Sequence, residues 1–130
     1  MWAVTQTNRF KASVASAGIS NWLSYTGTNG ISQWMLPYFD KYVYEDPAIY
    51  ARSAPINFIG KVRTPTFAFA GELDIECPPS QSMEFSRALE LFGVPTSLAI
   101  YPGEGHTMHN PKNIEDVDRR VLEWFDKYLR

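Results

Sequence analysis

The sequence predicts an α/β fold in which a mostly parallel sheet is flanked by helices. From residue 64 onward, short apolar runs alternate with amphipathic helical patterns, and the connections are short. The run Phe67–Ala70 is continuously apolar, as expected for a central parallel strand. The chain has 130 residues and is 45% hydrophobic, which is enough for one core and too apolar for disorder.

The first third of the chain predicts short elements. The opening stretch, MWAVTQTNRFK, has the pattern of an amphipathic helix that lacks an N-cap, so we expect the chain to begin inside a larger domain. Residues 10–20 predict a buried strand that ends at Gly18, because small side chains suit a strand packed closely between helices. Residues 21–30 are rich in turn formers and predict a loop or a short helix.

Residues 31–46 carry large apolar side chains at helical spacings and predict a helix that Pro37 interrupts. Residues 46–62 predict one or two helical turns and then a connection limited by proline.

The second half predicts strand, helix, strand and helix in that order. The strands fall in residues 64–74 and 95–103, and the first helix in residues 78–93, where Gly93 is suited to end it. Residues 110–130 predict the last helix. Its apolar stripe consists of Ile114, Val117, Val121, Trp124, Phe125 and Tyr128.

Composition excludes several classes of protein. The formal net charge is −2, with 12 basic and 14 acidic residues and no basic stripe, so we expect no nucleic-acid partner. No apolar run approaches the roughly 20 residues that span a bilayer, and no signal-peptide pattern is visible. The single cysteine, Cys77, excludes an internal disulfide and a multi-cysteine zinc site. We therefore expect a cytoplasmic protein that uses no cofactor and no metal.

Two loops offer titratable side chains at the carboxyl ends of predicted strands. Asp74 follows the strand predicted to end at Gly71, and His106 lies 32 positions later in the glycine-rich loop YPGEGHTMH. Chemistry in such sheets gathers at this edge. An acid followed by a histidine is the last part of a hydrolase triad in the order Ser, Asp, His. By spacing alone, a turn aspartate and an ordinary loop histidine remain open as alternatives.

Three longer stretches together resemble a known family. They are WAVTQTNRFKASVASAGISNW, YARSAPINFIGKVRTPTFAFAGELD, and YPGEGHTMHNP followed by a helix ending in WFDKYL. The chain resembles the carboxyl-terminal part of the catalytic domain of prolyl oligopeptidase-type serine peptidases, in the acylaminoacyl-peptidase-like branch. The resemblance covers essentially the whole chain. It implies an α/β-hydrolase fold, with residues 1–130 forming the carboxyl-terminal half of its sheet as a partial catalytic domain.

The resemblance also implies roles for individual residues. Asp74 matches the triad aspartate and His106 the triad histidine. The family often has Asp-x-Arg-Val-Pro after the acid, whereas this chain has Asp74-Ile-Glu-Cys-Pro78. Glu76 thus replaces the usual basic residue, and Cys77 stands where an apolar residue commonly faces the substrate pocket. We expect Cys77 to be a pocket or core residue and not a reactive thiol.

The nucleophile of such a triad is missing from the sequence. None of its serines lies in a Gly-x-Ser-x-Gly elbow, which the family places just before WAVTQT. We therefore expect a serine-peptidase fragment that cleaves peptides only as part of a longer enzyme and has little activity alone. An esterase or lipase-like hydrolase and a non-catalytic interaction module stay open as alternatives. A half sheet would also leave an exposed edge, through which the chain could self-associate.

Other candidates near the two loops are weaker. His109 would form a metal site with His106 only if a third ligand were present, and none is evident. Solvated loop charges are the default for Glu72, Glu76 and Glu104, although one of them is a candidate to receive a substrate's amino end. Four aromatic residues predict core packing, with one or two lining an acyl or leaving-group pocket: Trp22, Trp34, Tyr38 and Tyr42.

Overall fold

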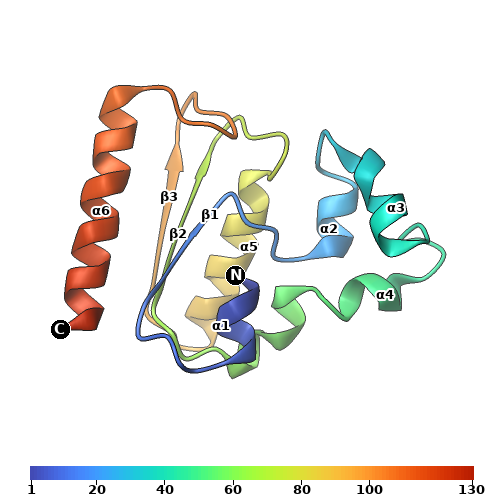
Figure 1. Ribbon diagram of the computed structural model, residues 1–130, viewed down its shortest axis with the longest axis horizontal. Helices are drawn as coiled ribbons and strands as arrows, with labels where there is room; N and C mark the ends of the chain where they lie inside the picture. The colour runs from blue at the N-terminus through green and yellow to red at the C-terminus, as the bar shows by residue number, and fades with distance from the viewer.

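The computed structural model describes residues 1–130, and a three-stranded parallel sheet forms its centre (Figure 1). The strands are β1 (Ser13–Ser16), β2 (Thr66–Gly71) and β3 (Thr96–Tyr101), in the spatial order β1-β2-β3. In the central strand β2, Phe67 and Ala68 are at most 1% exposed, because the strand is covered on both faces. The continuous apolar run in the sequence therefore predicted the central strand correctly.

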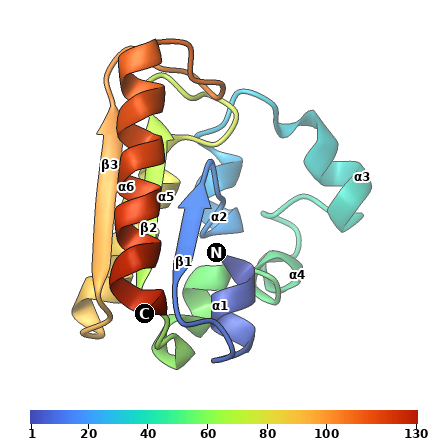
Figure 2. The same ribbon diagram turned by 60° about the vertical axis from the view of Figure 1, so that its left-hand side comes forward.

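Helices cover both faces of the sheet. The long helix α6 (Pro111–Leu129) lies on one face, and α5 (Pro79–Leu91) and α1 (Trp2–Gln6) lie on the other (Figures 1 and 2). Helix α5 contributes two residues to the main apolar core, which consists of Val4, Ile59, Val62, Phe85, Leu89 and Val94. The predicted stop of α5 is also confirmed, since Gly93 follows the helix with a φ of +69°, a conformation that glycine adopts without strain.

A separate group of short helices connects β1 to β2, on the right in Figure 1. It comprises α2 (Trp22–Thr26), the 3-10 turn η1 (Ser32–Trp34), α3 (Met35–Phe39), α4 (Pro47–Ala51) and the 3-10 turn η2 (Pro55–Lys61). Helices α2, α3 and α4 pack around a second core of Tyr25, Met35, Phe39, Val43 and Tyr50, whereas η2 contributes Ile59 to the first core. The α2–α4 region is thus held together by its own apolar cluster.

The prediction of a helix over residues 31–46 was wrong in its extent. Helix α3 ends at Phe39, because Asp40 adopts a left-handed conformation with a φ of +65°. Pro37 does not interrupt the helix, since it lies in the first turn, where a backbone N–H has no intrahelical acceptor. Tyr42 consequently lies in a turn beyond the helix.

The bounds of helix α6 were predicted to within one residue at each end, but its apolar stripe is less buried than expected. It begins after Asn110, whose side chain accepts a hydrogen bond from Lys112 N. Of its predicted stripe only Val117 is buried, and Ile114 is 41% exposed. The helix therefore covers its face of the sheet only in part. None of the helices is both long enough and apolar enough to cross a membrane.

A buried polar hub ties α5 to the segment that follows β1. Oε1 of Gln81 accepts hydrogen bonds from Ser20 N at 3.1 Å and Asn21 N at 3.0 Å. Gln81 Nε2 donates to Ser24 Oγ at 2.9 Å, and Glu84 accepts from Asn21 Nδ2 at 2.9 Å. Gln81 and Ser20 are almost fully buried, so these bonds replace those that water would otherwise make with their polar groups. The hub fixes where α2 begins.

Replacing Gln81 by leucine should lower the free energy of unfolding by about 2–4 kcal/mol, because buried backbone N–H groups lose their acceptor. Urea denaturation followed by circular dichroism measures this change. Gln33→Leu is the matched control, since Gln33 is exposed and should leave the midpoint almost unchanged. Equal midpoints for Q81L and Q33L would contradict the structural role of the hub.

Candidate active site

Two loops at the carboxyl ends of β2 and β3 are joined by backbone hydrogen bonds. The parallel register places Gly71 beside Tyr101, so the chain leaves both strands at the same level. Beyond this pair, Glu72 N donates to Tyr101 O at 3.0 Å and Leu73 N donates to Glu104 O at 2.8 Å. The register of β2 and β3 therefore sets the distance between residues that are about 30 positions apart in sequence.

Gly71 allows the two loops to approach this closely. A Cβ atom on Gly71 would lie 2.2 Å from Gly105 O and 2.4 Å from Glu104 O. No side chain fits at such distances, and both obstructing atoms belong to the backbone. The end of β2 therefore requires glycine for close approach, not for an unusual φ angle.

The joined loops bring Asp74 and His106 together, as the sequence predicted. His106 Nδ1 lies 3.0 Å from Asp74 Oδ2. The other carboxylate oxygen, Oδ1, accepts hydrogen bonds from Glu76 N at 2.9 Å and Cys77 N at 2.8 Å. The Asp74 side chain is 1% exposed, whereas that of His106 is 39% exposed. A fixed, buried acid thus holds a histidine that solvent can reach.

This geometry suits His106 to act as a general base. An ionised carboxylate only accepts hydrogen bonds, so its pairing with Nδ1 requires the imidazole proton to be on that atom. Nε2 then carries the free lone pair and is the atom that can take a proton from a nucleophile. Asp74 would stabilise the imidazolium that forms during this transfer.

The prediction that Glu104 is a solvated loop charge was wrong. Glu104 is 3% exposed, and its carboxylate accepts hydrogen bonds from His109 N, Asn110 N and Asn113 Nδ2 at 2.7–3.0 Å. It therefore joins the His106 loop to the start of α6. Sequence reasoning had one signal for this role, since an acidic residue close before a helix can satisfy its free N–H groups.

The hydrogen bond from His109 N, followed by that from Asn113, lowers the pKa of Glu104 below its ordinary value of 4.5. A lowered folded-state pKa stabilises the fold above the unfolded-state pKa, and the effect is lost as pH falls through the folded-state value. We expect the free energy of unfolding to fall as pH drops below about 4.5. Urea unfolding across this range measures the slope, which Glu104→Gln should reduce. An unchanged slope in E104Q would exclude this linkage.

Cys77 lies beside the acid and contributes its backbone N–H to Asp74. Its thiol is half-buried. Burial, and then the nearby carboxylates of Asp74 and Glu76, raise its pKa to about 11. The thiol therefore stays protonated near neutral pH, which supports the expectation that it is not reactive. Its place in a substrate pocket stays a prediction.

Alkylation tests this assignment of Cys77. Because the pKa is raised from 9.0 to about 11, the thiolate population should fall about 100-fold. Iodoacetamide should therefore modify the folded chain about 100-fold more slowly than the urea-unfolded chain at about pH 7.5. Mass spectrometry follows the reaction, and similar rates in the two states would contradict the raised pKa.

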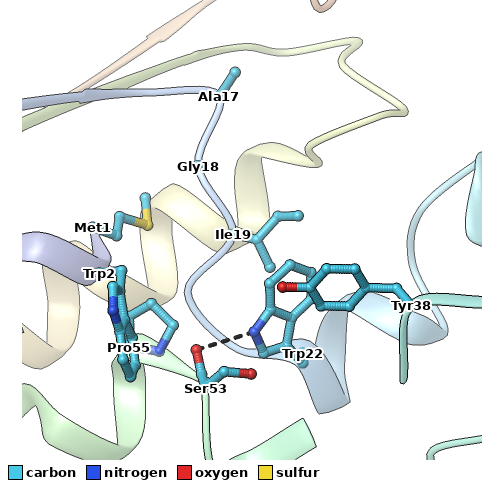
Figure 3. Close-up of a pocket in the computed structure, with 9 residues that line it drawn as sticks. All are labelled: Met1, Trp2, Ala17, Gly18, Ile19, Trp22, Tyr38, Ser53 and Pro55. Carbon is cyan, nitrogen blue, oxygen red and sulfur yellow. Dashed lines mark hydrogen bonds between the residues drawn. The ribbon is translucent and has the colours of Figure 1, made fainter. Parts of the chain in front are cut away.

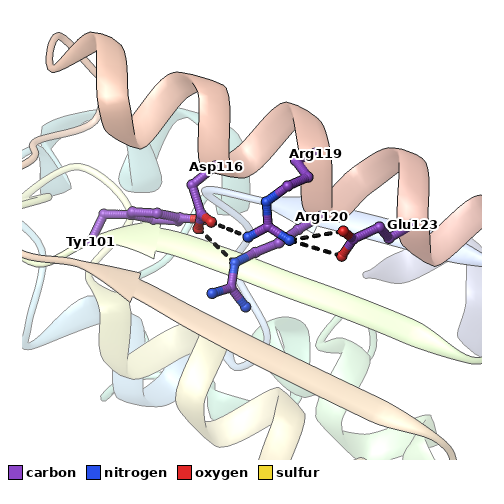
Figure 4. Close-up of polar contacts among 5 residues, drawn as sticks. All are labelled: Tyr101, Asp116, Arg119, Arg120 and Glu123. Atoms are coloured by element: carbon purple, nitrogen blue, oxygen red, sulfur yellow. Dashed lines mark hydrogen bonds and ion pairs between the residues drawn. The ribbon is translucent and has the colours of Figure 1, made fainter.

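Side chains of α6 anchor the end of β3 next to the histidine loop (Figure 4). Tyr101 Oη donates to Asp116 Oδ2 at 2.9 Å, and burial followed by this bond raises the pKa of Tyr101 to about 12. Asp116 also pairs with Arg120 and Arg119, and these bonds, led by that of Arg120, lower its pKa to about 2. Arg119 in turn binds Glu123 through both carboxylate oxygens. The network orients α6 relative to the strand that leads to His106.

The predicted aromatic group is divided between different surroundings. Trp22 and Tyr38 line a cavity of about 400 Å³ at the end of β1 (Figure 3). Trp22 is fixed there because its Nε1 donates to Ser53 O at 3.1 Å. Tyr42 lines a separate, smaller cavity of about 110 Å³. Trp34 packs edge-on against Trp22 and Tyr38, with ring centres 5.8 Å apart, and lines neither cavity.

The larger cavity is distinct from the acid–histidine pair. Its nine lining residues include neither Asp74 nor His106 and come mostly from the start of the chain and the segment after β1. They are Met1, Trp2, Ala17, Gly18, Ile19, Trp22, Tyr38, Ser53 and Pro55. No group of three or more His, Cys, Asp or Glu side chains is placed to hold a metal. The cavity therefore contributes no residue to the Asp74–His106 pair.

Known proteins match the chain over nearly its whole length. The profile of the Prolyl oligopeptidase family matches residues 1–130. The uncharacterized peptidase YuxL of Bacillus subtilis is 32% identical, over 98% of this chain and 20% of that protein. An acylamino-acid-releasing enzyme of Arabidopsis thaliana is 28% identical, over 95% of this chain and 17% of that enzyme.

Solved structures give the same result. The acylaminoacyl peptidase of Pyrococcus horikoshii superposes with a TM-score of 0.91 at 25% identity, covering 98% of this chain and 22% of that chain. The present chain thus spans about a fifth of the length of these relatives. The matching region is the carboxyl-terminal part of an α/β-hydrolase domain. The chain belongs to the prolyl oligopeptidase family.

Proposed function

We propose that the chain supplies the acid and the base of a serine-peptidase triad. The observation that carries this proposal is the 3.0 Å contact between His106 Nδ1 and the buried Asp74, which leaves Nε2 of a partly exposed imidazole free of that acid. Family membership supports peptides as the substrate class. The activity belongs to a protein that combines this chain with a nucleophile.

In the proposed reaction His106 Nε2 takes the proton of a serine hydroxyl as its oxygen attacks the peptide carbonyl. The imidazolium, stabilised by Asp74, then gives that proton to the departing amine, and the C–N bond breaks to leave an acyl-enzyme. Water repeats the sequence, with His106 again accepting and returning one proton. The carboxylic acid product is released and the serine is restored.

The serine of this triad is proposed to come from polypeptide outside the 130 residues. No serine of the chain has the Gly-x-Ser-x-Gly pattern that exposes a nucleophile at a strand-to-helix turn. The donors that stabilise the tetrahedral oxyanion would accompany it, since one of them is the backbone N–H of the residue after the serine.

A chimera tests the proposal. Residues 1–130 replace the matching segment of the Bacillus subtilis relative, and a fluorophosphonate probe and a peptide amide substrate are then applied. We expect the chimera to be labelled at its elbow serine and to cleave the substrate, whereas the isolated chain is not labelled. A folded chimera without labelling or turnover would reject the proposal, as would labelling of the isolated chain at one of its own serines.

An acid–histidine pair does not distinguish amide from ester substrates. An ester substrate measured beside the peptide amide separates a peptidase from the esterase or lipase-like alternative, and family membership favours the peptidase.

We propose a cytoplasmic location from composition, because the single cysteine gives no disulfide framework.

We also propose that the isolated chain self-associates through its sheet edges. β1 and β3 each pair only with β2, so one edge of each strand has unpaired backbone groups. Static light scattering over a range of concentrations should give a mass that rises with concentration. A constant monomer mass would reject self-association and would indicate that β1 and β3 are too short to pair with another chain.

A further inference from the structure

We propose that Glu76 is a specificity-determining residue that favours substrates with a cationic group next to the bond that is cleaved. Its Oε2 lies 3.9 Å from His106 Nε2, the atom that faces the reaction. Its backbone N–H donates to Asp74 Oδ1, so the acid of the proposed triad also fixes the position of the Glu76 backbone. This inference rests on the proposed function, because it assigns the substrate charge for the same site.

Glu76 is the one carboxylate of the two loops that is free to meet a substrate. Asp74 is occupied by His106 and by two backbone N–H groups. The Glu72 carboxylate accepts from Gly103 N at 3.0 Å, and Glu104 accepts three hydrogen bonds in the loop interior. Glu76, by contrast, is 46% exposed, and the only basic group within 4 Å of its carboxylate is the His106 imidazole.

No basic side chain of the site neutralises this carboxylate. Residues 71–79 and 101–110 contain no lysine or arginine but four acidic residues, so these two loops carry net negative charge. A bound substrate also displaces water and strengthens charge interactions at this position. An ammonium or guanidinium group within reach of Glu76 is therefore favoured, and a substrate carboxylate is disfavoured.

Two sources could supply the cation: a free amino terminus or a lysine or arginine side chain. Peptide pairs separate them. The first pair is an alanyl peptide amide with a free and with an acetylated amino terminus, and the second is an acetylated peptide amide with lysine or norleucine. The two peptides of a pair differ mainly in one positive charge. If Glu76 favours the charged peptide of the first pair, the cation is an amino terminus; if it favours that of the second pair, the cation is a basic side chain.

The first test uses the 130-residue chain and needs no serine. Each peptide is added to the chain while the NMR signals of the Glu76 and His106 side chains are followed, which gives its dissociation constant. For at least one pair, we expect the cationic peptide to bind on the order of fivefold more tightly than its neutral partner. Glu76→Gln should abolish this difference. Glu115→Gln, which alters an exposed carboxylate of α6, should leave it intact. Equal titrations of both pairs, or an unchanged difference in E76Q, would overturn the proposal.

The second test measures kcat/KM in the chimera. We expect the same preference for the cationic substrate, its loss in E76Q and its reversal in Glu76→Lys, while each variant still cleaves the neutral substrates. Cleavage of neutral substrates without any charge preference would overturn the role of Glu76 and leave the proposed function standing. Absence of all cleavage and labelling would instead reject the proposed function, and the titrations on the chain alone would still decide the role of Glu76.

Discussion

Replacing Asp74 by asparagine in the chimera should lower kcat by about 10⁴-fold and change KM little. The amide can donate to His106 Nδ1, so it favours the tautomer whose Nε2 already carries a proton and cannot take one from the serine. The 1% exposure of the Asp74 side chain strengthens this effect, because water cannot replace the lost acceptor.

Asp118→Asn is the matched control for this measurement, because Asp118 is an exposed acid on α6. The control should keep kcat within about twofold of the parent value. Steady-state hydrolysis of a peptide amide, combined with circular dichroism of each variant, separates loss of catalysis from loss of folding. A folded D74N variant with more than a tenth of the parent kcat would show that Asp74 does not orient the base.

Replacing Gly71 by alanine should lower the free energy of unfolding of the chain by about 3 kcal/mol or more. The new Cβ would lie 2.2 Å from a backbone oxygen of the histidine loop, so β2 and β3 must move apart at their ends. The same movement would separate Asp74 from His106. One methyl group is thus expected both to lower stability and to disrupt the Asp74–His106 contact.

Gly27→Ala provides the comparison for this second prediction. A Cβ at Gly27 meets nothing within 4 Å, so the substitution should change stability by only a few tenths of a kcal/mol. Urea unfolding of G71A and G27A gives the two free energies. Comparable stability of the two variants would mean that the loops can shift at little cost, and that the close approach is not required.

The fold and the contact between Asp74 and His106 could be predicted because they depend on local patterns and on known motifs. β2 is marked by a continuous apolar run, α5 by its flanking proline and Gly93, and the histidine loop by its glycines. Parallel strands then place Asp74 and His106 at one edge of the sheet, so their contact follows from strand order. The prediction needed no knowledge of distances.

What the sequence did not predict depends on tertiary partners. Glu104 resembles any loop acid until the start of α6 folds over it and buries its carboxylate. Gln81 has the character of an ordinary polar residue in the first turn of a helix, but Ser20 and Asn21, about 60 positions earlier, make it a buried hub. The helix expected over residues 31–46 ends early because Asp40 adopts a left-handed conformation, which helical spacing alone does not reveal.

The central claim is that Asp74 holds His106 as a base with its proton on Nδ1. Nitrogen-15 NMR of the imidazole in the 130-residue chain, recorded at about pH 9, tests this claim most directly, because it needs neither substrate nor serine. We predict a protonated Nδ1 hydrogen-bonded to Asp74 and an unprotonated Nε2, with this preference lost in D74N. A proton mainly on Nε2 in the parent chain, or identical spectra for the parent and D74N, would contradict the account.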